Sequence, residues 1–177
     1  MILDNPDESF IQCEKNSILV KAMKKEKILL LRYNRYKMSD FIEAHQHIID
    51  KNGFVWMLKI GKRLPALSLQ SILDGSKTLI LKAPKGDGGQ FYKLDLLDFH
   101  NGDALNDFCY PEYYEEMVED EEVWMLDSLS GTWLKVKNIV QLSDADINKL
   151  RLISNDKLAY DVLNCTRSAV LYVYISE

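Results

Sequence analysis

The spacing of apolar residues changes along the chain, and the first changes mark a strand followed by a helix. Four apolar residues in a row give way to polar ones over 28–34, which predicts a short buried strand. Apolar residues then recur every three or four positions, which predicts a helix over about 40–51 with one apolar face. Asp40 and Glu43 form a capping-box pattern at its start, and Gly53 is the residue expected to end it.

The stretch from Gly53 to Lys62 is the most informative part of the sequence. It predicts a strand with apolar or aromatic residues on both faces, followed by the basic pair Lys62-Arg63. Aromatic rings beside cations suit the binding of a flat base and a phosphate. The same rings also suit the core of a small barrel, so both uses stay open at this point.

Beyond residue 77 the pattern is mainly that of short strands separated by turns. Strands joined by turns favour a mostly antiparallel, curved or closed sheet over a doubly wound parallel one. The expected fold class is therefore α+β, with a mostly antiparallel, curved or closed sheet and short helices. The remaining expected elements are strands over 78–81, 90–99, 122–126, 132–140 and 168–175, and short helices over 66–73, from Pro111, over 144–150 and over 157–163.

The first residues differ from the rest because they form a polar stretch without periodicity that contains Pro6. We expect an N-terminal arm and a short helix over 1–26, followed by a single domain over 27–177.

Composition limits what this domain can bind. The 177 residues are 47% apolar, enough for a packed core, and the formal net charge is −5. A protein that coats nucleic acid draws its affinity from many cationic contacts to phosphate, so the acidity argues against that class. A pocket that recognises one nucleotide with a few local cations remains compatible with it.

The cysteines and the N-terminus predict a location. Three widely separated cysteines argue against a disulfide framework or a zinc site, and reduced thiols in the cytoplasm fit best. The acidic N-terminus lacks the cationic segment of a signal peptide. The longest apolar runs have the length of strands, so no membrane partner is expected.

Three stretches of the chain carry a resemblance to a known superfamily. They are the strand and helix that lead into Gly53-Phe54-Val55-Trp56 and Gly61-Lys62, the strand Gly131-Thr132-Trp133-Leu134-Lys135-Val136, and the closing run from Leu150 to Ile175. In this order they resemble the PUA-like superfamily, and within it the EVE and YTH type of domain, over about residues 27–177. The chain departs from that family in its acidity and its weak supply of cations.

The resemblance implies a small β-barrel flanked by helices that recognises nucleic acid without catalysis. Members of the superfamily often accept a flipped, modified base in a pocket lined with aromatic rings, and many bacterial members are thought to serve in defence against foreign DNA. The implied partner is DNA, RNA or a nucleotide, and no cofactor is implied.

Tryptophans are the candidate stacking residues of such a pocket, above all Trp56 and Trp133. Stacking on a ring is worth about 1–3 kcal/mol per base, which offsets much of the cost of flipping a base. In a strand, Phe54 and Trp56 share one face while Val55 and Met57 share the other. Because both faces are apolar, a place in the core is the competing interpretation for each tryptophan.

The candidate phosphate ligands are basic residues near the ends of predicted strands, with one tyrosine among them. The loop 82–89 lacks the Gly-Lys-Ser/Thr of a Walker loop, but its glycines allow backbone N–H groups to approach an anion. A hairpin loop and solvated strand ends are the plainer interpretations. The candidates are Arg32, Tyr33, Lys59, Lys62, Arg63, Lys82 and Lys85.

The sequence offers no catalytic or metal-binding set. His45 and His47 are two residues apart on the predicted helix, so they face different sides and do not share a metal. His45 lies on the apolar face, which favours a histidine buried in the core. The acidic turns near 95–103 and 119–122 lack a lysine at the spacing that nucleases use, so we expect a non-catalytic protein.

The alternative class is a protein-protein interaction module or a small acidic inhibitor or adaptor. The stretch from Tyr110 to Met117 combines tyrosines with glutamates, and tyrosine is common at protein interfaces. The N-terminal arm offers a second contact for a partner. A concave pocket with an aromatic wall and a positive rim would favour nucleic acid, and a flat apolar patch around Tyr110 to Met117 would favour a protein partner.

Overall fold

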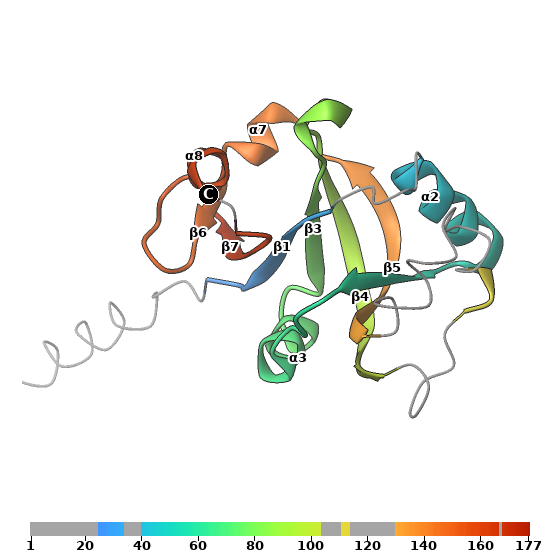
Figure 1. The fold of residues 1–177 in the computed structure, drawn as a ribbon. Helices are drawn as coiled ribbons and strands as arrows, with labels where there is room; N and C mark the ends of the chain where they lie inside the picture. Colours follow the sequence, from blue (N-terminus) through green and yellow to red (C-terminus); the bar gives the residue numbers. More distant parts are fainter. Residues whose placement is uncertain (1–24, 34–39, 104–110, 114–129, 167) are drawn as a thin grey trace, which may run out of the picture.

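The chain forms one mixed sheet with helices on both faces (Figure 1). The computed structural model describes residues 25–33, 40–103, 111–113, 130–166 and 168–177. The fold class of these residues is α+β, as expected from the sequence. In chain order their elements are β1 (Ile28–Arg32), α2 (Phe41–Asn52), β2 (Val55–Ile60), α3 (Ala66–Asp74), β3 (Thr78–Lys82), the 3-10 turn η2 (Lys85–Asp87), β4 (Phe91–Asp103), β5 (Ser130–Gln141), α7 (Asp144–Ile147), β6 (Leu150–Leu152), α8 (Ala159–Cys165) and β7 (Val170–Ile175).

The strand order in the sheet is β2-β5-β4-β3-β1-β7-β6. Among the described strands every pairing is antiparallel except that of β1 with β3, so the expectation of a mostly antiparallel sheet is confirmed. The predicted barrel is not confirmed, because no described pairing joins the end strands β2 and β6 and the sheet stays open. One end strand, β6, has only three residues and offers few backbone groups for closure.

Two apolar clusters pack against the two faces of the sheet. The strand β1 shows the alternation clearly, because Leu29 and Leu31 join one cluster while Ile28 and Leu30 join the other. The first cluster includes residues of α2 and α3, and the second includes residues of α8. Figure 1 accordingly shows α2 and α8 on opposite sides of β1 and β3. Burial on both faces explains why β1 reads as an uninterrupted apolar run.

The helix ends follow the sequence signals unevenly. Gly53 adopts a left-handed conformation with φ of 79° and donates its N–H to the Ile49 carbonyl, as expected of a C-terminal cap. Asp40 occupies the N-cap position of α2, but its side chain makes no capping hydrogen bond. The side chains of Ser143 and Asp146 form a capping box at the start of α7.

Helix α7 is shorter than the predicted helix over 144–150. It ends at Ile147, and the strand β6 begins at Leu150, where Leu150 and Leu152 are buried on either side of the half-buried Arg151. A three-residue strand carries too little alternation to be predicted from sequence. The helix predicted over 157–163 exists as α8 and is shifted by two residues.

Several predicted features lie outside the described residues. These features are the N-terminal arm and short helix up to residue 24, the strand over 122–126, and residues 110 and 114–117 of the proposed partner segment. Within the described part of the chain, no helix has the length and apolar character needed to cross a membrane.

A closed ring of hydrogen bonds fixes the chain just after the basic turn at Lys62-Arg63. The buried Thr132 hydroxyl accepts a 2.9 Å hydrogen bond from the Leu64 N–H and donates to the Asn101 side-chain oxygen. The Asn101 amide then donates to the Leu64 carbonyl at 2.7 Å. The ring ties β4 and β5 to the exit of β2.

Replacing Thr132 with valine is expected to lower the free energy of unfolding by about 2 kcal/mol, because it leaves the Leu64 N–H and the Asn101 oxygen without their partner. Thr132→Ser keeps the hydroxyl and serves as the matched control. Urea unfolding of the two variants measures the difference. Equal stability of both would show that the ring does not stabilise the fold.

Candidate functional site

The nine predicted site residues are divided between opposite ends of the sheet. At one end of β4, Phe91 pairs with Lys82. At the other end, Gly102 pairs with Gly131, which in turn pairs with Ile60 of β2. These ends are separated by about 35 Å of strand at roughly 3.3 Å per residue. The basic residues at the exit of β2 therefore do not form one site with Lys82.

The aromatic strand β2 already has a cation beside its rings, and that cation belongs to this chain. The Lys135 ammonium lies 4.0 Å from the Phe54 ring centroid and 5.8 Å from that of Trp56. This geometry confirms that Phe54 and Trp56 share a face. The half-buried Trp56 also donates its backbone N–H to the Tyr113 hydroxyl at 2.7 Å.

Lys59 lies near the end of β2, and Lys62 and Arg63 follow in the turn beyond it. The Lys59 ammonium donates to the Lys62 carbonyl, while the Lys62 and Arg63 side chains are exposed. No described pocket is lined by these three residues. The exit of β2 is thus an exposed basic turn.

Trp133 lies in the core. It is fully buried near the start of β5, with Leu58 of β2 and His100 of β4 as its register partners. A ring in this position has no face open to a base, so the prediction that Trp133 stacks on a ligand is wrong. The competing interpretation of this tryptophan is the right one.

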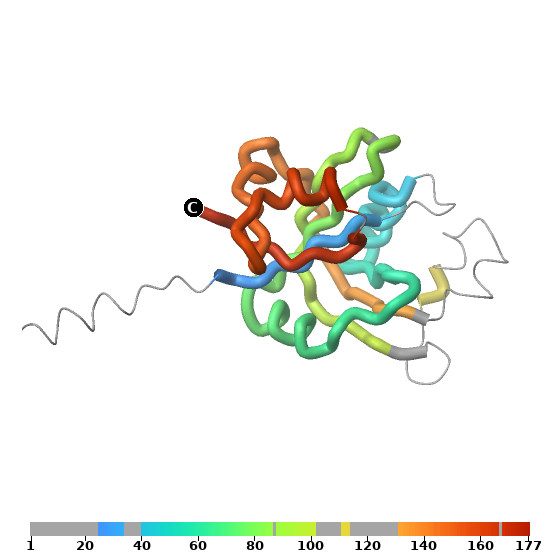
Figure 2. The backbone as a smooth tube through the Cα atoms, turned by 60° about the vertical axis from the view of Figure 1, so that its left-hand side comes forward, coloured from blue at the N-terminus to red at the C-terminus, as the bar shows by residue number. Residues whose placement is uncertain are grey.

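The other four predicted residues line a single pocket, which we call the basic pocket. Its volume is about 310 Å³, and its lining residues are Arg32, Tyr33, Lys82, Ala83, Pro84, Lys85, Leu163 and Asn164. The sheet explains the gathering: β1 and β3 are parallel, and Arg32 and Lys82 are register partners at their carboxyl ends. Figure 2 shows the end of β1 beside the chain at the end of α8. Ligands commonly bind outside the carboxyl ends of parallel strands.

Arg32 and Lys82, the two cations at the strand ends, are held in place but have few hydrogen bonds in the described part of the chain. Arg32 donates from its Nη2 to the Leu163 carbonyl, while its Nε is buried without a hydrogen-bond partner in the described part of the chain. Lys82 is only 7% exposed. Its ammonium makes a long 3.5 Å contact with the Ala83 carbonyl and lies 5.5 Å from the Phe91 ring centroid.

The surroundings of Lys82 disfavour its positive charge. Burial lowers the pKa of Lys82, and the nearby charges of Arg32 and Lys85 lower it further. No Asp or Glu is among the described residues that line the basic pocket. An anion entering the pocket would therefore meet a positive charge that no described lining residue balances.

Tyr33 forms an aromatic wall of the basic pocket. Its ring stacks on Phe41 of α2, with centroids 4.5 Å apart and planes 14° from parallel. One face of the tyrosine ring is therefore covered by Phe41. A wall of this kind beside several cations matches the expected aromatic wall and positive rim.

The glycine loop after β3 follows the plainer of its two interpretations, a hairpin loop between β3 and β4. The Gly88 N–H donates to the Lys85 carbonyl and the Gly89 N–H donates to the Pro84 carbonyl, both at 3.1 Å. These amides are committed to the turn η2 and do not form a cradle for an anion. Contacts to a ligand would come from the side chains of Lys82 and Lys85.

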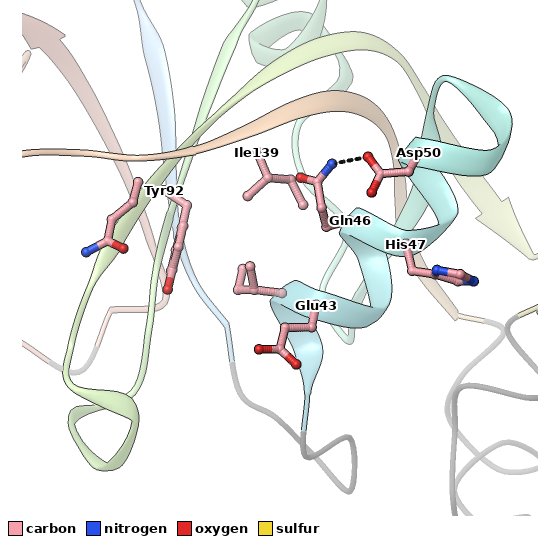
Figure 3. A pocket seen from close by; sticks show the side chains of 8 residues that line it. Glu43, Gln46, His47, Asp50, Tyr92 and Ile139 are labelled. Atoms are coloured by element: carbon pink, nitrogen blue, oxygen red, sulfur yellow. Dashed lines mark hydrogen bonds between the residues drawn. The ribbon is translucent and has the colours of Figure 1, made fainter.

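A second pocket, the α2 groove, has the opposite character (Figure 3). It measures about 420 Å³ and lies between α2 and the strands β4 and β5. Glu43 and Asp50 line it, Gln46 donates to Asp50 at 2.7 Å, and His47 points away from Tyr92. None of its described lining residues is lysine or arginine, so it is unsuited to a phosphate.

Sequence reasoning missed the contribution of α8 to the basic pocket. Leu163 supplies the carbonyl that holds Arg32, and the exposed Asn164 adds an amide to the lining. These residues lie more than a hundred positions from Arg32, and no local pattern marks them. In the described part of the chain, no three His, Cys, Asp or Glu side chains are grouped as a metal site requires.

Comparison with protein-family models, with curated proteins and with solved structures found no match to this chain. The PUA-like resemblance accordingly stays a prediction, and the case for a function depends on the basic pocket.

Proposed function

We propose that this protein is a non-catalytic recognition module that binds nucleic acid or a nucleotide by holding a phosphate group in the basic pocket. The observation that carries the proposal is an uncompensated cluster of cations. Arg32, Lys82 and Lys85 line one pocket that has no carboxylate among its described lining residues, and Lys82 is more than nine-tenths buried.

Burying an ammonium without a counter-ion is costly, and proteins seldom keep such a group without a use for it. A bound phosphate offsets this cost, because it brings negative charge and several acceptor oxygens to the pocket. The free Nε of Arg32 and the poorly bonded Lys82 ammonium supply donors for those oxygens. The protein would then gain both hydrogen bonds and charge balance on binding.

Nucleic acid is the favoured source of the phosphate for two reasons. Tyr33 and Asn164 flank the cations with an aromatic edge and an amide, which suit a sugar or a base next to the phosphate. The resemblance to PUA-like domains points to the same class of ligand. The net charge of −5 favours a local contact over a long basic track.

Replacing Lys82 with methionine is expected to weaken the binding of a short single-stranded oligonucleotide by about 10- to 100-fold, because one charged hydrogen bond is lost. The folding stability of the Lys82→Met protein should equal or exceed that of wild type, because the substitution removes a buried charge from the unbound protein. Fluorescence anisotropy with DNA and RNA strands measures the affinity. Lys157→Met, at an exposed lysine outside the pocket lining, is the matched control.

Salt dependence provides a second readout of the same contact. With one phosphate held in the pocket, the affinity should fall only by roughly twofold for a threefold rise in salt. Equal affinity of wild type and Lys82→Met for every strand would contradict the proposal. So would a salt dependence as steep as that of a protein that coats nucleic acid.

A further inference from the structure

We infer that the basic pocket selects a terminal phosphate, the phosphomonoester at the end of a nucleic-acid strand or on a nucleotide, over the phosphodiesters within a strand. This inference rests on the function proposed above, and it names the form of phosphate that the site takes. Two features of the pocket support it, namely the balance of charge and the depth of Lys82.

The charge of the pocket matches a dianion better than a monoanion. Three basic side chains line it and no described carboxylate offsets them. A phosphodiester carries a single negative charge, whereas a phosphomonoester carries about −1.5 to −2 at neutral pH. The monoester also presents three terminal oxygens, which can meet Arg32, Lys82 and Lys85 at the same time.

The position of Lys82 limits how a ligand reaches it. Only 7% of this residue is exposed, so a phosphate has to enter the pocket to contact the ammonium. The pocket lining brings Pro84 and Lys85, which follow β3, together with Leu163 and Asn164 near the end of α8. A phosphate inside a strand carries a sugar on each side and would have to bring both into this space. A terminal phosphate carries one sugar and can enter end first.

The test uses oligonucleotides of about eight nucleotides that carry the fluorophore in the middle, so that both ends are free. Four versions share one sequence: 5′-phosphate, 3′-phosphate, both, and hydroxyl at both ends. We expect a terminal phosphate to raise the affinity by about tenfold or more, because a charge-assisted contact is gained. Comparing the 5′ and 3′ versions identifies which end is recognised, and a mononucleotide should compete for the site.

The preference for a terminal phosphate should shrink as the pH falls from about 7.5 to about 5, because the second proton of the phosphate binds near pH 6. The described lining of the basic pocket has no histidine and no carboxyl group, and it presents Arg32, Tyr33, Lys82 and Lys85 to the ligand. A loss of the Lys82 proton at higher pH would act in the opposite direction, so the two causes can be told apart.

The Lys82→Met variant tests this inference separately from the function on which it rests. In Lys82→Met the four versions should bind alike, while in Lys157→Met the preference should remain. If hydroxyl-ended strands bind wild type as tightly as phosphorylated ones and Lys82→Met still weakens them, the terminal-phosphate inference is wrong and the proposed function stands. If no strand or nucleotide binds, the proposed function is wrong as well.

Discussion

Trp133→Ala is expected to lower the free energy of unfolding by about 3–5 kcal/mol, the largest effect among the variants considered. Trp133 is fully buried and is the largest of the completely buried side chains. It lies on β5, the strand that joins β2 to β4, so its loss leaves a cavity at a junction of the sheet. Chemical denaturation monitored by circular dichroism measures the change.

Two further substitutions show whether Trp133 is structural. Trp56→Ala removes a half-buried ring from the end strand β2 and should cost clearly less, about 1–2 kcal/mol. Trp133→Phe keeps most of the apolar volume and should leave oligonucleotide binding unchanged. If Trp133→Phe lost oligonucleotide binding but kept its stability, a direct role of Trp133 in binding would be indicated.

Stability is expected to fall by about 2 kcal/mol between pH 7.5 and pH 5, and by about 3 kcal/mol at pH 4, because of His45 alone. This histidine is fully buried on α2, and burial lowers its pKa from 6.5 to about 4. Its Nδ1–H donates to the Phe41 carbonyl at 2.6 Å, and its ring packs 4.2 Å from the Phe41 ring. The folded protein therefore keeps His45 neutral.

The direction of this pH effect follows from comparing the protonation of His45 in the folded and the unfolded protein. Below pH 6.5 the unfolded chain takes up a proton on this histidine, but the folded protein does so only near pH 4, so acid favours unfolding over that interval. Urea unfolding at several pH values should show a shallower pH dependence in His45→Gln than in wild type. His47→Gln, at an exposed histidine on the same helix, should keep the wild-type dependence.

Direct titration of the ring by NMR gives a measurement that does not depend on the stability of the variant. The His45 signals should barely shift between pH 7.5 and pH 5. A His45 that titrates near pH 6.5 would contradict the assignment.

Much of the fold could be predicted from local patterns. The apolar spacing of α2 predicted both the helix and the burial of His45, and Gly53 predicted where it ends. The alternation in β2 predicted the shared face of Phe54 and Trp56, which the Lys135 contacts bear out. Each of these features depends on residues within a few positions of one another, where side-chain type and backbone geometry are directly linked.

The sequence-based predictions failed where the structure depends on residues that are far apart in the chain. The strand β6 is stabilised by pairing with β7 and by packing against α8. Its three residues are too few to show a strand periodicity in the sequence. The resemblance to PUA-like domains implied a barrel, whereas the described sheet is open. The parallel pairing of β1 with β3 follows from the path of the chain through α2, β2 and α3. Sequence reasoning favoured antiparallel neighbours and so overlooked that pairing.

The sequence alone was enough to name the four basic or aromatic residues that line the basic pocket, because all four were among its candidates. Only the tertiary structure decided which of them belong together. The parallel register placed Arg32 beside Lys82, and α8 closed the pocket around them. The same sheet separated them from Lys62 and Arg63 and enclosed Trp133 in the core. The physical reason is that charge and aromatic character belong to each residue, whereas burial and neighbourhood depend on how distant segments pack.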